Sequence, residues 1–85
     1  MCGIFGCTGE NSLSNTLRAL KLLEYRGYDS VGVGVKTDKI NVVKTVGRSQ
    51  NLTYVCPKFE HIANCIGHTR WATHGAVEAR NAHPF

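Results

Sequence analysis

The sequence has no long apolar run, no cluster of like charges and no internal repeat. No apolar stretch approaches the roughly 18 residues that a membrane-spanning helix needs. Ten Lys and Arg against six Asp and Glu give a net charge of +4. The basic residues are scattered, so we expect neither nucleic acid nor a membrane as a partner. The N-terminus lacks the positive start and long apolar segment of a secretory signal, and we therefore expect a cytoplasmic protein.

Cysteine is too sparse for a small protein stapled by disulfides. Cys2, Cys7, Cys56 and Cys65 are even in number but widely spaced. Because thiols in the cytoplasm stay reduced, we expect these four to be free.

A zinc module is one alternative, because Cys56, His61 and Cys65 are followed closely by His68 and His74. Structural zinc sites usually show closely spaced pairs of Cys or His ligands. Only half of that spacing is present here, so we expect no metal.

At 85 residues the chain is one small domain at most, or a piece of a larger one. Its hydrophobic share of 42%, with three Phe, three Tyr and one Trp, is enough for a core. A chain this short buries only about two-thirds of the surface that its unfolded form exposes, so the margin of stability is small.

Apolar periodicity predicts one helix and several strands that follow one another directly. Leu13, Leu17 and Leu20 repeat at helical spacing. Asn11, Ser12 and Ser14 offer capping side chains before them, and Gly27 is suited to end the helix. We expect a strand at 4–8, a helix up to about 25–27, strands at 31–35, 40–46 and 66–71, a turn at 37–39 and a loop over 72–85; residues 51–55 fit a strand or a helix. Consecutive strands favour an α+β fold over a doubly wound one.

Glycine alternates with valine in the strand at 31–35, which leaves one bare face at Gly32 and Gly34. A bare face indicates that something packs unusually close to the sheet, and Gly6 suggests the same for the first strand. Four strands with one helix would cover one face of the sheet and leave the other open. We therefore expect an incomplete domain.

The first candidate for chemistry is Cys2. Removal of Met1 would leave a thiol and a free α-amine on one residue. An α-amine has a pKa of about 7.7–8.0, so near neutral pH it can accept the thiol proton, and one residue supplies both nucleophile and base. Gly3 would leave room for a substrate. An N-terminal cysteine without any role is the alternative interpretation.

The second candidate is the segment 67–75. The guanidinium of Arg70 can hold a carboxylate through two parallel hydrogen bonds, and a threonine hydroxyl with backbone N–H groups near Gly75 would complete an anion site. The alternatives are a surface ion pair for Arg70 and a core position for Trp71. In the segment 26–30, the charged residues are most simply a structural brace.

Together these segments resemble the class II glutamine amidotransferases, in particular their hexosamine-forming branch. The resemblance implies an incomplete N-terminal nucleophile (Ntn) hydrolase fold, an αββα sandwich, of which residues 1–85 form the opening part. The rest of the glutaminase domain and the sugar isomerase domains lie outside these residues. The matching segments are MCGIFG at 1–6, EYRGYDS at 24–30, HTRWATHG at 68–75 and NAHP at 81–84.

The resemblance also implies roles for individual residues. Cys2 would attack the side-chain amide of L-glutamine, form a γ-glutamyl thioester and release ammonia. In the hexosamine-forming branch this ammonia goes to fructose 6-phosphate, bound by the isomerase region of a homo-oligomeric enzyme, without a cofactor. The other implied positions are Arg70 for the α-carboxylate of glutamine, Thr73 and His74 lining the same pocket, Trp71 near the ammonia exit, and Gly3 and Arg26 close to the nucleophile.

Two features of that family are missing from residues 1–85. The family's oxyanion hole comes from an Asn-Gly pair, and its substrate ammonium is bound by an aspartate, both later in the sequence. Loss of one oxyanion donor costs about 10²–10³ in rate. We therefore expect residues 1–85 alone to be inactive, and a non-catalytic truncated product or interaction stub is the alternative function.

Overall fold

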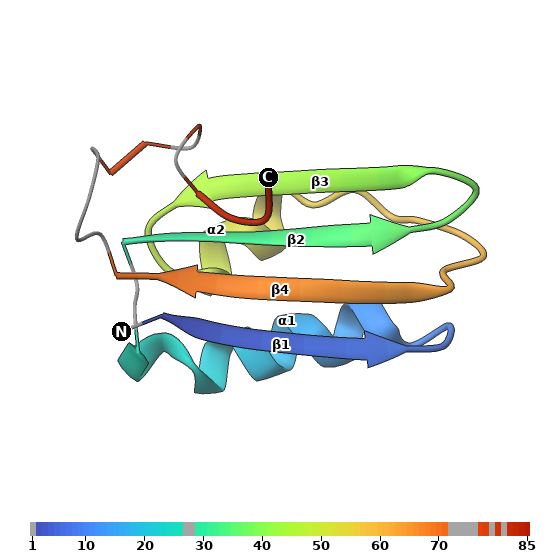
Figure 1. Cartoon of the computed structure of the whole chain (residues 1–85), viewed down its shortest axis with the longest axis horizontal. Helices are drawn as coiled ribbons and strands as arrows, with labels where there is room; N and C mark the ends of the chain where they lie inside the picture. Colours follow the sequence, from blue (N-terminus) through green and yellow to red (C-terminus); the bar gives the residue numbers. More distant parts are fainter. Residues whose placement is uncertain (1, 27–28, 72–76, 79, 81) are drawn as a thin grey trace.

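Four antiparallel strands form one sheet, and two helices cover one of its faces (Figure 1). The computed structural model of the chain describes residues 2–26, 29–71, 77–78, 80 and 82–85. The elements are β1 (Gly3–Thr8), α1 (Ser12–Leu22), the 3₁₀ turn η1 (Glu24–Arg26), β2 (Ser30–Lys36), β3 (Ile40–Val46), α2 (Ser49–Val55) and β4 (Asn64–Arg70). The expected α+β class and all the expected strands are confirmed.

The strand order is β1-β4-β2-β3, so the last strand lies between the first and the second. Gly3 pairs with Thr69, and Ser30 pairs with Arg70. Three segments that are far apart in the sequence therefore meet at one end of the sheet: the start of β1, the start of β2 and the end of β4 (Figure 1).

Helix α1 lies where the leucine spacing predicts, with Leu20 fully buried. The expected side-chain cap is wrong, because the side chain of Asn11 at the N-cap makes no capping hydrogen bond. Instead the hydroxyl of Ser14 donates to the carbonyl oxygen of Asn11 at 3.0 Å. The α-helical part ends at Leu22 and continues as the 3₁₀ turn η1. Gly27 lies outside the described residues.

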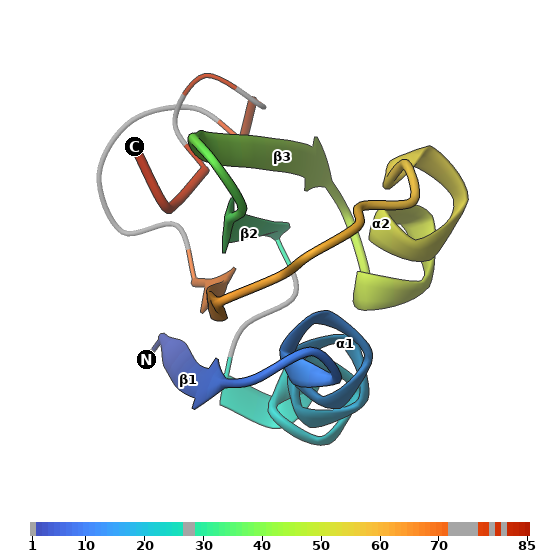
Figure 2. The same cartoon turned by 90° about the vertical axis from the view of Figure 1, so that its right-hand side faces the viewer.

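The ambiguous segment 51–55 belongs to a helix, α2, and Leu52 from it is fully buried in the core. Figure 2 shows that α1 and α2 lie on the same face of the sheet. The expectation of a single covering helix is therefore wrong. No helix in the part of the chain that the structure describes is long and apolar enough to cross a membrane.

The core lies between the sheet and this helical layer. Val31, Val33 and Val35 point toward it from β2 and are at most 1% exposed, and they pack with Leu20 and Leu52. Because side chains alternate along a strand, the same alternation turns the glycines of β2 toward the face without helices. The valine pattern thus fixes which face of β2 the helices cover.

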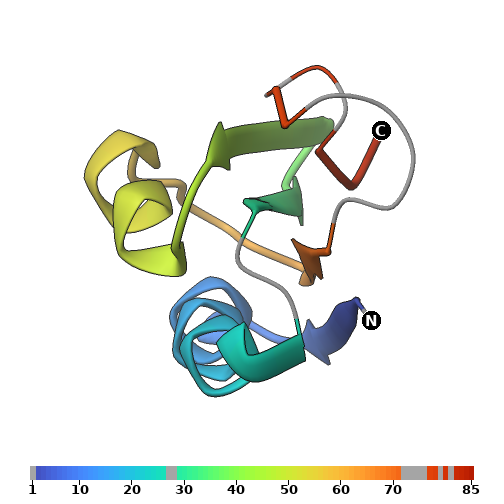
Figure 3. The ribbon, with the colours of Figure 1, turned by 90° about the vertical axis from the view of Figure 1, so that its left-hand side faces the viewer.

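The prediction that something packs against the bare face of β2 is confirmed. A Cβ atom at Gly32 would collide with the carbonyl oxygen of His83, and one at Gly34 would lie 3.3 Å from Cγ of Pro84. The C-terminal segment, residues 82–85, therefore lies on the face opposite the helices, as Figure 3 also shows. The same expectation for Gly6 is wrong, since its Cβ would meet only Ile66 among the described residues, at 3.8 Å.

On the helix-covered face, the closest approach to the sheet occurs at Gly67. A Cβ atom there would lie 2.6 Å from Cγ2 of Thr16 and 3.0 Å from both methyl carbons of Leu20. Helix α1 can rest directly on β4 because residue 67 has no side chain.

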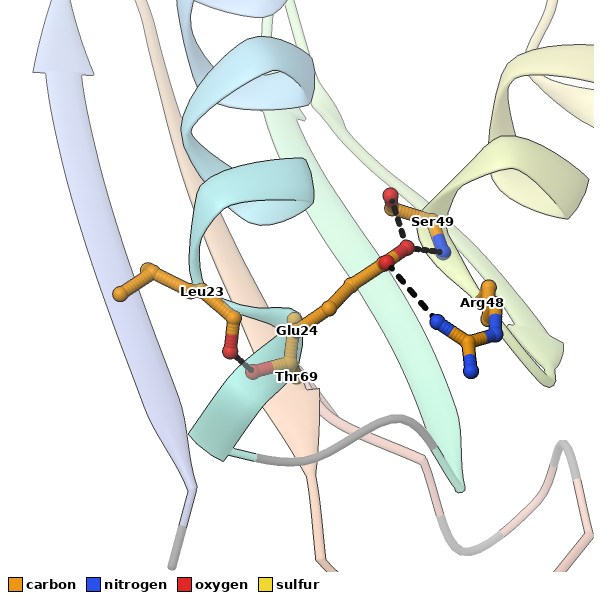
Figure 4. A network of polar contacts seen from close by, with 5 residues as sticks. All are labelled: Leu23, Glu24, Arg48, Ser49 and Thr69. Atoms are coloured by element: carbon orange, nitrogen blue, oxygen red, sulfur yellow. Dashed lines mark hydrogen bonds and ion pairs between the residues drawn. The ribbon is translucent and has the colours of Figure 1, made fainter.

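A carboxylate ties the end of α1 to the start of α2 (Figure 4). Glu24 accepts hydrogen bonds from the backbone N–H and the hydroxyl of Ser49, at 3.0 and 2.7 Å, and lies 3.4 Å from a guanidinium nitrogen of Arg48. Burial alone would raise the pKa of Glu24, but the hydrogen bonds from Ser49 and the charge of Arg48 outweigh it and hold that pKa below its usual value. Glu24 thus caps a helix to which it does not belong.

We expect Gly67→Ala to lower the free energy of unfolding by roughly 1–3 kcal/mol, because α1 must move away from the sheet. The matched control is Gly6→Ala, where the nearest described atom is 3.8 Å away and the change should be small. Urea unfolding measures both. Equal effects at the two positions would contradict the close approach of α1 to β4.

We expect Glu24→Gln to cost about 1 kcal/mol at neutral pH, as for the loss of a helix cap. A carboxyl group whose pKa is lowered by folding stabilises the protein above its unfolded pKa of about 4.3 and loses this effect as the pH falls through its folded value. The difference between variant and wild type should therefore shrink below about pH 4.3. Thermal melts across pH test this, with exposed Glu60→Gln as control; a difference that does not change with pH would contradict it.

Candidate active site

The candidate nucleophile and the candidate carboxylate anchor lie at the same end of the sheet. Cys2 directly precedes β1, and Arg70 is the last residue of β4. Gly3 pairs with Thr69, so continuing this register by one residue places Cys2 opposite Arg70. Alternation then turns both toward the face that carries no helix.

The peptide bond that follows Cys2 is held on both sides. Its carbonyl oxygen accepts a hydrogen bond from Nε of Arg26 at 3.2 Å. Its N–H group, which belongs to Gly3, donates to the hydroxyl oxygen of Thr69, also at 3.2 Å. Cys2 itself is exposed and is a free cysteine. The structure therefore brings Arg26 into contact with the candidate nucleophile, while Met1 lies outside the described residues.

The side-chain space at Gly3 is occupied by protein. A Cβ atom there would lie 2.6 Å from the hydroxyl oxygen of Thr69 and 2.9 Å from Cβ of Leu23. This space is thus filled on the helical side of the sheet rather than left open for a substrate.

Arg70 is only 7% exposed, so the alternative of a surface ion pair is wrong. Trp71 is 47% exposed, so the alternative of a core position for it is wrong as well. The carbonyl oxygen of Arg70 accepts a hydrogen bond from the backbone N–H of Asp29 at 3.0 Å, and the carbonyl oxygen of Asp29 accepts one from Gly47 at 2.9 Å. Asp29 therefore braces neighbouring segments through its main chain.

His68 lies on the same face as Arg70, two residues earlier in β4, and its ring lies 4.6 Å from that of His83 between centroids. Burial lowers the pKa of His68, and the neighbouring His83 and Arg70 lower it further. The rings of His68 and His83 thus lie against each other on the face of β4 that also carries Arg70.

The zinc alternative gains no support from this arrangement. Cys65 points into the core, whereas His68, three residues later, lies on the opposite face of the sheet. Within the described ranges, no three side chains of His, Cys, Asp or Glu are grouped so that they could hold a metal ion. His74 lies outside those ranges, as does Thr73.

Sequence reasoning missed Thr69 and Leu23, which contact Gly3, the residue that follows the candidate nucleophile. The available signal was Gly3 itself, since a glycine inside a strand often marks the close approach of another group. That signal gives the position of the contact, but pairing with a residue 66 positions away cannot be read from local sequence.

Comparison with known proteins identifies relatives over nearly the whole chain. The chain is 48% identical over 85 residues to the isomerizing glutamine–fructose-6-phosphate aminotransferase of Methanosarcina acetivorans, covering 99% of this chain and 14% of that protein. The enzymes of the same name from Campylobacter jejuni and Clostridium acetobutylicum are 48% and 51% identical, over 88 and 87 residues, again with 99% of this chain covered and 15% and 14% of theirs. No protein-family model matches the chain.

The chain thus spans about one-seventh of the length of these relatives. The match falls on their N-terminal part. By sequence, the chain is homologous to the N-terminal part of the isomerizing glutamine–fructose-6-phosphate aminotransferases.

Proposed function

We propose that residues 1–85 supply the nucleophile-bearing part of a glutaminase site of the class II amidotransferase type. The observation that carries this proposal is the position of Cys2: exposed, followed by a peptide bond held on both sides, and one residue before Gly3, which pairs with Thr69, the neighbour of Arg70 in β4. A nucleophile fixed beside a carboxylate-binding group is what the hydrolysis of a free amino acid amide requires.

In the proposed reaction, the α-amine of mature Cys2 takes the thiol proton, and the sulfur attacks the carbonyl carbon of the glutamine side-chain amide. The C–N bond breaks, and the nitrogen leaves as ammonia after it receives the proton from the α-amine. This leaves a γ-glutamyl thioester on Cys2. Water then attacks the thioester, releases glutamate and restores the thiol.

The remaining roles are assigned by position and by the family resemblance. We assign Arg70 to the α-carboxylate of glutamine, Thr73 and His74 to the same pocket, and Trp71 to the ammonia exit. A guanidinium is charged at neutral pH, and its planar group of donors suits a carboxylate.

The proposed fold is the opening part of an αββα sandwich. The face without helices carries exposed Ile4, Ile40 and Ile66, which are 76%, 73% and 52% exposed. Apolar residues grouped on one sheet face favour packing against a second sheet. In this proposal, the second sheet and the oxyanion donors come from outside residues 1–85.

For the whole protein, we propose the reaction that the relatives' name describes. The ammonia would be passed to fructose 6-phosphate and give glucosamine 6-phosphate, in a homo-oligomeric enzyme without a cofactor. The support is the identity of 48–51% to enzymes of that name.

We expect Cys2→Ala to abolish ammonia release from glutamine by the complete product of the open reading frame, because the thioester cannot form. Cys56→Ala should leave turnover within about twofold, since that thiol lies away from the site. Residues 1–85 alone should show no turnover without the oxyanion donors, whose loss costs at least about 10²-fold.

The same preparation tests the nucleophile directly. Mass spectrometry should show Cys2 as the first residue, and a glutamine-mimicking alkylating agent should label it in preference to Cys56 and Cys65. A retained Met1, or labelling of the three thiols at equal rates, would contradict the proposal.

We expect Arg70→Lys to raise KM for glutamine by roughly 10-fold to 100-fold, which corresponds to the loss of a charge-assisted hydrogen bond. The matched substrate is 4-aminobutanamide, which has the same amide and amine but no α-carboxylate. Its kcat/KM should be nearly the same for wild type and variant. An equal loss with both substrates would show that Arg70 does not bind the carboxylate.

A further inference from the structure

A buried hydroxyl contacts the backbone immediately after the candidate nucleophile. Thr69 is 1% exposed, and its Oγ1 accepts the hydrogen bond from the N–H of Gly3 at 3.2 Å. The same hydroxyl donates to the carbonyl oxygen of Leu23 at 3.3 Å, as drawn in Figure 4. One side chain thus links β1, β4 and the end of α1.

The hydroxyl group of Thr69 both donates and accepts a hydrogen bond in this link. A threonine hydroxyl has one proton to donate and lone pairs to accept with, and here it does both toward main-chain groups. Leu23 follows the last α-helical turn, where carbonyl groups lack partners within the helix. Its carbonyl oxygen also accepts a hydrogen bond from the backbone N–H of Arg26 at 2.9 Å, so Thr69 adds a second hydrogen bond at the helix end while it accepts one from the N–H of Gly3.

Because the peptide bond is planar, the contact with Thr69 also restricts the position of Cys2. Nε of Arg26 donates a hydrogen bond to the carbonyl oxygen of Cys2, and the hydroxyl of Thr69 accepts one from the N–H of Gly3. These two groups belong to the same peptide plane and point in opposite directions. Because the six atoms of a peptide unit lie in one plane, two contacts of this kind fix the plane and with it Cα of Cys2. Only the rotations about Cα–C and Cα–Cβ then remain to direct the amine and the thiol.

The absence of a side chain at position 3 is what lets the hydroxyl reach the backbone. A Cβ atom at Gly3 would lie 2.6 Å from Oγ1 of Thr69, closer than real Cβ atoms approach other groups. The glycine after the nucleophile and the threonine on the neighbouring strand are thus two parts of one contact.

We propose that Thr69 is a positioning residue for the nucleophile: its hydroxyl holds the peptide bond between Cys2 and Gly3, and so places the Cys2 thiol for attack on the substrate amide. The inference rests on the proposed function, in which Cys2 is the nucleophile. Thr69 acts through the backbone and does not itself touch the substrate.

The test compares Thr69→Val, which keeps the shape and removes the hydroxyl, with Thr69→Ser, which keeps the hydroxyl. Both are made in the complete gene product, and active sites are titrated with the glutamine-mimicking alkylating agent. Thr69→Val should lower kcat per titrated site by at least about tenfold, since a displacement of 1 Å can cost on the order of 10²-fold. KM for glutamine should stay within about twofold, and Thr69→Ser should restore kcat to within about threefold.

Thr16→Val is the matched control, because Thr16 is equally buried and lies over Gly67, farther along β4. It should leave kcat per titrated site unchanged. Gly3→Ala leaves Thr69 unchanged but displaces its hydroxyl, and it should therefore also lower kcat. It replaces Thr69→Val in the test if Thr69→Val does not fold.

The two possible failures are distinguishable. Turnover that survives Cys2→Ala overturns the proposed function and the positioning role with it. Turnover that depends on Cys2, but with equal kcat in Thr69→Val and Thr16→Val, overturns the positioning role alone. A lower kcat in Thr69→Val that Thr69→Ser does not restore also overturns it.

Discussion

The antiparallel pairing of β1 with β4 is the constraint on which the candidate site depends. It sets Gly3 beside Thr69 across 66 residues of sequence and thereby brings the start of the chain to the end of β4. Pairing over such a separation closes a long loop, which costs conformational entropy before any contact is gained. The contacts that offset this entropy loss lie on the helical face, where α1 packs on β4 at Gly67 and on the valines of β2.

Core packing and the candidate site residues are therefore on opposite faces of β4. In β4, Cys65, Gly67 and Thr69 face the helices and are buried, whereas His68 and Arg70 face the other side. A strand alternates its side chains between two environments, so one short segment can carry both the core and an anion-binding group. Thr69 connects the two, because it is buried with the core and bonded to the backbone next to Cys2.

Local patterns were enough to predict the strands and the first helix, because alternation and helical spacing are properties of neighbouring residues. The segment 51–55 remained ambiguous, since its β-branched and aromatic residues suit a strand and only the docking of Leu52 into the core decides for a helix. Bare glycines correctly indicated close packing at Gly32, yet the same reasoning failed at Gly6, where no partner approaches among the described residues. Arg70 of β4 was a candidate from its residue type, but the pairing of β4 with β1, and with it the contact of Thr69 with Gly3, was not predictable because strand order is set by contacts between distant segments.

The environments of Cys56 and Cys65 bear on the proposed preference for Cys2 over these two thiols. Burial raises the pKa of Cys56, and nearby Cys65 raises it further; burial likewise raises the pKa of Cys65, with an added effect from Cys7. The thiolate is the reactive form, so a raised pKa reduces the reactive fraction near neutrality. Cys2 is instead exposed at the edge of the sheet, outside this buried group. The proposed selectivity would thus follow from the same division of faces: the core raises the pKa of Cys56 and Cys65, and the strand end exposes Cys2 with the following peptide bond held in place.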